Sequence, residues 1–368
     1  MFTFSDMAIR FAKKTERDFH SAVKARVAAY FKENDLHPNA NGEMKMKALL
    51  HGVLYLIGYF ALMSGYFSSL SMLALYAYLG LITGLMGFNV SHDALHNAFS
   101  SKRWVNRLLG YTFDYNGESS YVWKETHNAL HHTFTNITGM DGDINKAPLL
   151  RFSPMDPWRP FNRFQPYYVL FLYSLVTLPW VYYTDYKIFT KAMKEGKTSR
   201  NDAIAFFFFK ALNFSLMVIL PILALPYAWW QIVIGNIIMH MTAGLSISIV
   251  FQLAHLVEGV YFPAPDEEGK IQDEWAVHEM KTTSNFATEN RFLSYWLGGL
   301  NFQVEHHLFP HVCHVHYPEI SKIVKACASE YQVPYNEHKT FKQAIVSHFR
   351  HLNRLAKSPD YARETISG

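Results

Sequence analysis

The sequence predicts an all-α, polytopic membrane protein with four transmembrane helices and a cytosolic helical cap that holds a histidine-rich metal site. Two long stretches indicate the membrane. Residues 48–92 contain no Asp, Glu, Lys or Arg, and residues 203–257 contain only Lys210. Each stretch is long enough for two spans of about 20 residues. The third observation is an excess of histidine, 19 residues, many of them gathered in short clusters.

These stretches divide the chain into five segments of one domain. We expect a cytosolic amphipathic arm at 1–47, transmembrane hairpins at 48–91 and 203–257, and cytosolic regions at 92–202 and 258–368. The arm carries basic residues with no apolar signal-peptide core behind them, namely Arg10, Lys13, Lys14 and Arg17.

Residues 167–183 are apolar enough to suggest a further crossing. A crossing there would place the histidines before and after it on opposite sides of the membrane. We therefore expect this segment to lie along the interface, where its Tyr residues and Trp180 are at home.

Charge and cysteine content exclude several classes of function. The net charge is +4, and no run of Lys or Arg is long enough to indicate nucleic-acid binding. Cys313 and Cys327 form no CxxC or CxxCH motif, which excludes a disulfide framework, a zinc ribbon and a covalent haem site. A reducing compartment is the expected setting.

Three histidine clusters carry the chemistry. On a helix, residues i and i+4 share one face, so a pair at that spacing can bind one metal ion. Each cluster alone also fits an ordinary buried or surface histidine, whereas three together do not. The clusters are His92 and His96, then His127, His131 and His132, then Gln303, His306 and His307.

His255 is the eighth candidate ligand, near the cytosolic end of the last span, where an unpaired polar group is costly. Eight histidines exceed what one tetrahedral zinc ion uses, so two metal ions are implied. Imidazole suits zinc, copper, iron and nickel, which leaves the element open. No Glu-x-x-His occurs, which excludes the carboxylate-bridged di-iron class. The residues expected to support the ligands are Asp93, Asp141, Asp143, Gln303, His314 and His316.

The motifs HDALH, HNALHH and QVEHH resemble the three histidine boxes of the membrane fatty acid desaturases, over about residues 45–330. Gln303 stands in place of the first histidine of the third box, as in the front-end subgroup, which acts between an existing double bond and the carboxyl end. The chain is similar to bacterial linoleoyl-CoA or acyl-lipid delta-6-type desaturases. The resemblance implies that the eight histidines bind two iron ions, with O2 as co-substrate. It also implies an acyl-CoA or acyl-lipid substrate and a bacterial inner-membrane site that faces the cytosol.

Two departures from the family pattern bear on this expectation. The chain contains no fused cytochrome b5 domain, so we expect a separate electron donor such as a ferredoxin or cytochrome b5. Phe251 stands where related acyl-CoA desaturases have an Asn that helps to hold a metal-bound water.

Three other functions fit parts of the pattern. A di-iron fatty acyl or lipid hydroxylase shares the ligand set and differs in its product. A metal transporter would place its ligands near mid-membrane in broken helices. A zinc hydrolase needs only three or four protein ligands.

Overall fold

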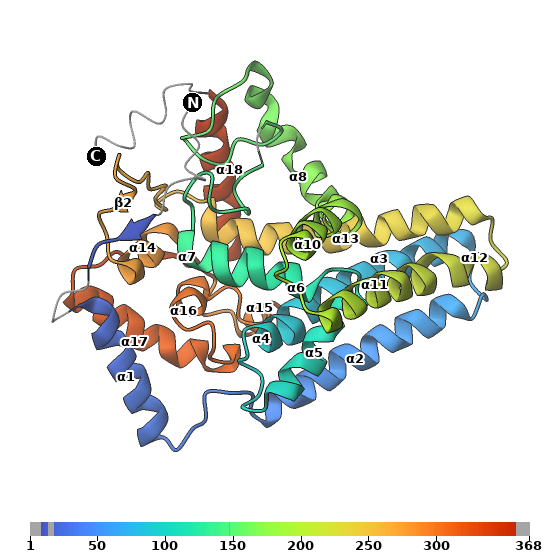
Figure 1. The fold of residues 1–368 in the computed structure, drawn as a ribbon, viewed down its shortest axis with the longest axis horizontal. Coiled ribbons are helices and arrows are strands. Elements are labelled where there is room, and N and C mark those ends of the chain that lie inside the picture. The colour runs from blue at the N-terminus through green and yellow to red at the C-terminus, as the bar shows by residue number, and fades with distance from the viewer. Residues whose placement is uncertain (1–8, 14–17, 147, 358–368) are drawn as a thin grey trace. The chain divides into compact units, whose positions relative to one another are not determined.

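A computed structural model of the chain describes residues 9–13, 18–146 and 148–357 (Figure 1). The remaining residues lie outside these ranges, and they include Lys14 and Arg17 of the expected arm. The chain divides into two compact units. Unit 1 comprises Met1–Pro38, Glu125–Val169 and Val250–Gly368, and unit 2 comprises Asn39–Lys124 and Leu170–Ile249.

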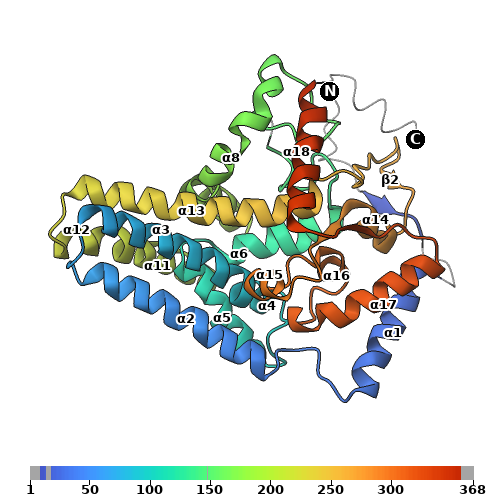
Figure 2. The ribbon, with the colours of Figure 1, turned by 180° about the vertical axis from the view of Figure 1, so that it is seen from behind.

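Four helices are long and apolar enough to cross a membrane, as predicted. They run alongside one another in both ribbon views (Figures 1 and 2). The first is α2 (Gly42–Met63), and the second joins α3 (Ser69–Met86) through a π-helical turn to α4 (His92–Leu95). The third joins α11 (Arg200–Phe214) to α12 (Leu220–Ala224), and the fourth is α13 (Trp229–His255).

Close contact between α3 and α13 depends on small residues. A Cβ atom added at Gly80 would overlap the backbone carbonyl of Met239, and one at Gly235 would overlap the Tyr76 ring. Small residues let membrane helices approach until their backbones touch, which strengthens van der Waals packing where lipid competes for apolar surface. The Tyr76 hydroxyl donates to the Met217 carbonyl at 3.1 Å.

Lys210 is the single charged side chain of the third span beyond its first turn, between residues 203 and 224, and its ammonium group is fully paired. It donates to the Asp185 carboxylate at 2.7 Å and to the carbonyls of Gly117 and Val181 at 2.6 and 2.8 Å. A lysine has three donors, so none is left unsatisfied in this apolar setting. These contacts connect α11 to the turn after α5 (Arg103–Tyr115) and to the π-helical turn that leads into α10 (Asp185–Lys194).

The segment expected along the interface is helical but broken. It consists of α8 (Gln165–Leu175), α9 (Thr177–Pro179) and a π-helical turn, followed by α10 (Asp185–Lys194). Among the residues that the structure describes, it is not one of the helices able to span a membrane. Its location at the interface stays a prediction.

Unit 1 is mainly helical and contains two short pairs of parallel strands, which the sequence did not predict. The strands are β1 (Arg10–Phe11) with β2 (Lys270–Ile271), and β3 (Ser284–Phe286) with β4 (Asn336–His338). Its core packs Phe19, Val23 and Val27 of α1 (Phe19–Glu33) against α16 and α17. The other helices of unit 1 are α7 (His132–Phe134), α14 (Trp275–Thr282), α15 (Arg291–Trp296), α16 (Gln303–Leu308), α17 (Tyr317–Glu330) and α18 (Phe341–Lys357), whereas α5 (Arg103–Tyr115) and α6 (Ser120–Trp123) belong to unit 2.

Candidate metal centre

Three buried histidines meet in unit 1 from segments far apart in the sequence. His131 ends a π-helical turn (Lys124–His131), His255 is the last residue of α13, and His307 lies in α16. Their ring centroids are 4.8 to 5.0 Å apart. One nitrogen of each can lie within 4.8 Å of the others, so the three can hold one metal ion.

Each of these imidazoles is hydrogen-bonded at Nδ1, which leaves its Nε2 available as a metal ligand. Among the described residues, no hydrogen-bond partner reaches any of the three Nε2 atoms, all of which are buried. Histidine ligands bind a metal through one nitrogen and donate the other N–H to a carboxylate or carbonyl, so the arrangement fits a metal ion. The Nδ1 partners are Asp141 for His131 at 3.1 Å, the Thr282 carbonyl for His255 at 3.4 Å, and Glu279 for His307 at 2.7 Å.

Two carboxylates set the electrostatics of this cluster. Burial lowers the pKa of His131, but the charge and hydrogen bond of Asp141, together with the charges of Asp143 and Glu279, outweigh burial and raise this pKa to about 9. Burial raises the pKa of Glu279 well above its ordinary value, against the opposing effects of a Thr135 hydrogen bond and of His131. A cation at the Nε2 atoms would add positive charge and favour the ionised form of Glu279.

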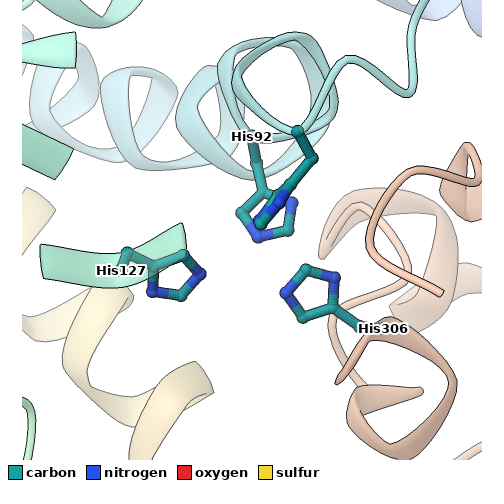
Figure 3. Close-up of side chains that lie close together, drawn as sticks. His92, His127 and His306 are labelled. Atoms are coloured by element: carbon teal, nitrogen blue, oxygen red, sulfur yellow. The ribbon is translucent and has the colours of Figure 1, made fainter. Parts of the chain in front are cut away.

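His127, His132 and His306 form a second group in unit 1. The π-helical turn is wider than an α-helical one, so residue i+5 comes nearly into line with residue i. His132 stands five residues after His127. Its Nε2 lies 3.2 Å from the His127 Nε2, and its ring centroid lies 4.6 Å from that of His306. His127 and His306 stack at 6.1 Å, and both appear in Figure 3.

His92 and His96 belong to unit 2, where they have the predicted helical spacing. The His96 N–H donates to the His92 carbonyl at 3.1 Å, and the two rings are 4.7 Å apart. Trp123 lies against both imidazoles, at 5.6 and 5.2 Å between centroids. The Asp93 carboxylate is 3.9 Å from the His92 Nδ1, beyond direct hydrogen bonding.

The predicted supporting residues differ in their contacts. Asp141 bonds directly to a ligand imidazole, and Asp143 reaches within 3.6 Å of the His131 Nδ1. Gln303 is fully buried, and neither atom of its side-chain amide has a hydrogen-bond partner among the described residues. His314 and His316 lie in a 3-10 turn beyond the third cluster, where the His316 ring packs on Phe31 at 5.1 Å. Phe251 packs edge-on against His127 at 5.7 Å.

Glu279 was not predicted. It lies in α14, its side chain is fully buried, and it accepts from both His307 and the Thr135 hydroxyl, the latter at 2.8 Å. Its histidine partner is 28 residues away, so no local spacing marks it. Thr282, whose carbonyl faces His255, was missed for the same reason.

Known proteins resemble the chain over most of its length. It matches the family described as fatty acid desaturase over residues 48–339. An sn-1 linoleoyl-lipid 6-desaturase of Synechocystis sp. is 38% identical, with 95% of this chain and 98% of that protein covered. The enzyme of the same name from Arthrospira platensis is 35% identical, with coverage of 93% and 94%. An acyl-lipid (8-3)-desaturase of Physcomitrium patens is 32% identical, with coverage of 96% and 74%. The chain therefore belongs to the fatty acid desaturase family.

Proposed function

We propose that the protein is an O2-dependent acyl-lipid desaturase that adds a cis double bond on the carboxyl side of an existing one, at the delta-6 position of a linoleoyl chain. The observation that carries the proposal is the group of three buried imidazoles, each held at Nδ1 and each with a buried Nε2 that has no hydrogen-bond partner among the described residues. Family membership supplies the reaction class, and the names of the relatives supply the substrate class and bond position.

The metals are two iron ions held by the eight histidines. His131, His255 and His307 form one ligand group, and His127, His132 and His306 contribute to the other. We include His92 and His96 because eight ligands suit two ions and because their motif matches the first histidine box of the family. Imidazole is a suitable ligand for iron, and the absence of a Glu-x-x-His motif supports a histidine-ligated site over a carboxylate-bridged one.

Each turnover removes one hydrogen from each of two adjacent methylenes and forms the alkene. Two electrons from a donor and two protons complete the reduction of O2 to two waters. Iron, when bound, supplies the O2 chemistry needed to break unactivated C–H bonds. The chain's own residues fix the imidazole tautomers through Asp141, Glu279 and the Thr282 carbonyl, and they bury the ligands away from water.

The remaining assignments concern partners and location. The electron donor is a separate protein, a ferredoxin or a cytochrome b5. The four candidate spans support an integral membrane protein. We place it in a bacterial inner membrane, with both termini and all the histidines on the cytosolic side.

Expression in a host supplied with linoleate tests the proposal. Mass spectrometry of derivatised fatty acids should find one added double bond, located at delta-6. A hydroxylated product would instead indicate the hydroxylase alternative. A bond on the methyl side would refute the bond position alone, and no product with a competent donor present would refute the function.

A further inference from the structure

The outer face of α18 is an unusually basic surface of unit 1. The stretch from His338 to Lys357 contains five Lys and Arg residues and no Asp or Glu. All five side chains are exposed, and exposed Val346 lies among them along the helix. We call this surface the α18 face. It comprises Lys339, Lys342, Val346, Arg350, Arg354 and Lys357.

The charges of the α18 face are only slightly compensated by the protein. Glu258 contacts Arg354 and lies 3.7 Å from Arg350, and Glu337 interacts electrostatically with Lys339. Among the described residues, the other cations of the face have no ion pair. On α17 the pattern differs, because Lys322 pairs with Glu319 at 2.7 Å and Lys325 with Glu337 at 2.6 Å. The α18 face therefore retains a net positive charge.

The buried side of α18 connects this face to a metal-ligand segment. The His348 Nδ1 lies 2.7 Å from the Leu256 carbonyl, directly after His255, and the Ser347 hydroxyl accepts from the Glu258 N–H at 2.8 Å. His348 is two residues from Arg350, so a short path of covalent bonds and one hydrogen bond leads from the basic surface to His255. Such a path favours electron transfer, because the rate of transfer falls less steeply with distance through bonds than through space.

We propose that the α18 face is the docking surface for an acidic one-electron carrier protein, whose electrons reach the metal centre through His348 and the Leu256 backbone. The inference rests on the proposed function, because the reaction needs two electrons from outside the chain. A positive surface steers an acidic partner and raises its association rate, and small interfaces are usual for redox partners.

An anionic membrane surface is the alternative ligand for a basic helix. A helix that lies on a membrane buries its apolar side in the lipid. In α18 that side is already packed inside unit 1, with Leu352 and Leu355 fully buried. The burial of its apolar side therefore favours a protein partner over lipid.

The test measures reduction of the iron-loaded enzyme in nanodiscs of phosphatidylcholine. The electron donors offered are a reduced acidic [2Fe–2S] ferredoxin and a reduced cytochrome b5, and whichever reduces the wild type is then used. The test variant is Lys342→Glu/Arg350→Glu. The control is Lys322→Glu/Lys325→Glu, which makes the same change in net charge on α17. Stopped-flow oxidation of the donor gives the second-order rate, and dithionite measures reduction without docking.

At low ionic strength, the α18 variant should be reduced by the donor at least about tenfold more slowly than the wild type. The control should stay within about twofold, and the difference should shrink at about 0.5 M salt. Dithionite should reduce all three proteins equally. Equal donor rates for all three, or an equal loss in both variants, would overturn the proposal.

An effect that appears only in nanodiscs of anionic lipid would also overturn it, in favour of a lipid contact. Failure of the proposed function has a separate signature. In that case dithionite would not reduce the loaded wild type, or the reduced protein would yield no desaturated product with O2.

Discussion

Replacement of Glu279 tests whether the Nδ1 anchors control the metal affinity of the histidines. Its carboxylate accepts from the His307 Nδ1 at 2.7 Å and from the Thr135 hydroxyl at 2.8 Å, and all three side chains are buried. Glu279→Ala leaves the His307 N–H with only the more distant Thr135 hydroxyl, 3.3 Å away, as an acceptor, at a cost of about 1 to 3 kcal/mol. That range corresponds to a loss of roughly 5- to 160-fold in metal affinity, and it includes the loss of about 10- to 100-fold that is usual when such a partner is removed.

Glu279→Gln separates charge from geometry. Glutamine keeps the size and one acceptor oxygen but loses the negative charge, so we expect about a tenfold loss of iron affinity, smaller than that of alanine. The assay is equilibrium competition with a chelator, with iron counted by mass spectrometry. Glu305→Gln is the matched control, because Glu305 is equally buried but bonds to Asn285 and Tyr335 instead of a histidine. An equal loss in the control, or no loss in Glu279→Ala, would refute the reasoning.

Three further predictions concern the membrane spans and the topology of the chain. Lys210→Ala should destabilise the protein by about 3 kcal/mol because it leaves the buried Asp185 carboxylate without its ion-pair partner. The added change Asp185→Asn should recover part of that loss in a thermal-shift assay. Gly80→Leu should lower the melting temperature by several degrees, whereas Gly42→Leu, at a site with nothing within 4 Å of the added Cβ, should leave it nearly unchanged. Single cysteines introduced near residues 140 and 190 should be labelled from the same, cytosolic side. Labelling from opposite sides would show that 167–183 crosses the membrane.

The transmembrane helices and the histidine clusters were accessible from sequence because both are local signals. A charge-free stretch of about 40 residues must be two spans or a very large core, and HxxxH spacing is a property of one helical turn. Lys210 illustrates the limit of this reasoning. The sequence identifies it as the one charge within the second hairpin, but its partners Gly117, Val181 and Asp185 come from other segments.

The anchors of the ligands were only partly predictable. Asp141 lies ten residues after its histidine in a polar turn, so proximity in sequence pointed to it. Glu279 and Thr282 reach the cluster only through the tertiary fold of unit 1. The π-helical turn of the second cluster was also missed, because a π-turn depends on packing around it and residue spacing alone gives the α-helical register.

The most direct test of the central claim is the metal content of an active preparation. We predict about two iron ions per chain, and we expect His131→Ala to lose iron and activity while it still inserts into the membrane. His20→Ala, at a position outside the histidine clusters, is the control and should keep both. Removal of iron with a chelator should abolish desaturation, and re-addition of Fe2+ should restore it. Stoichiometric zinc in a demonstrably active preparation would contradict the account.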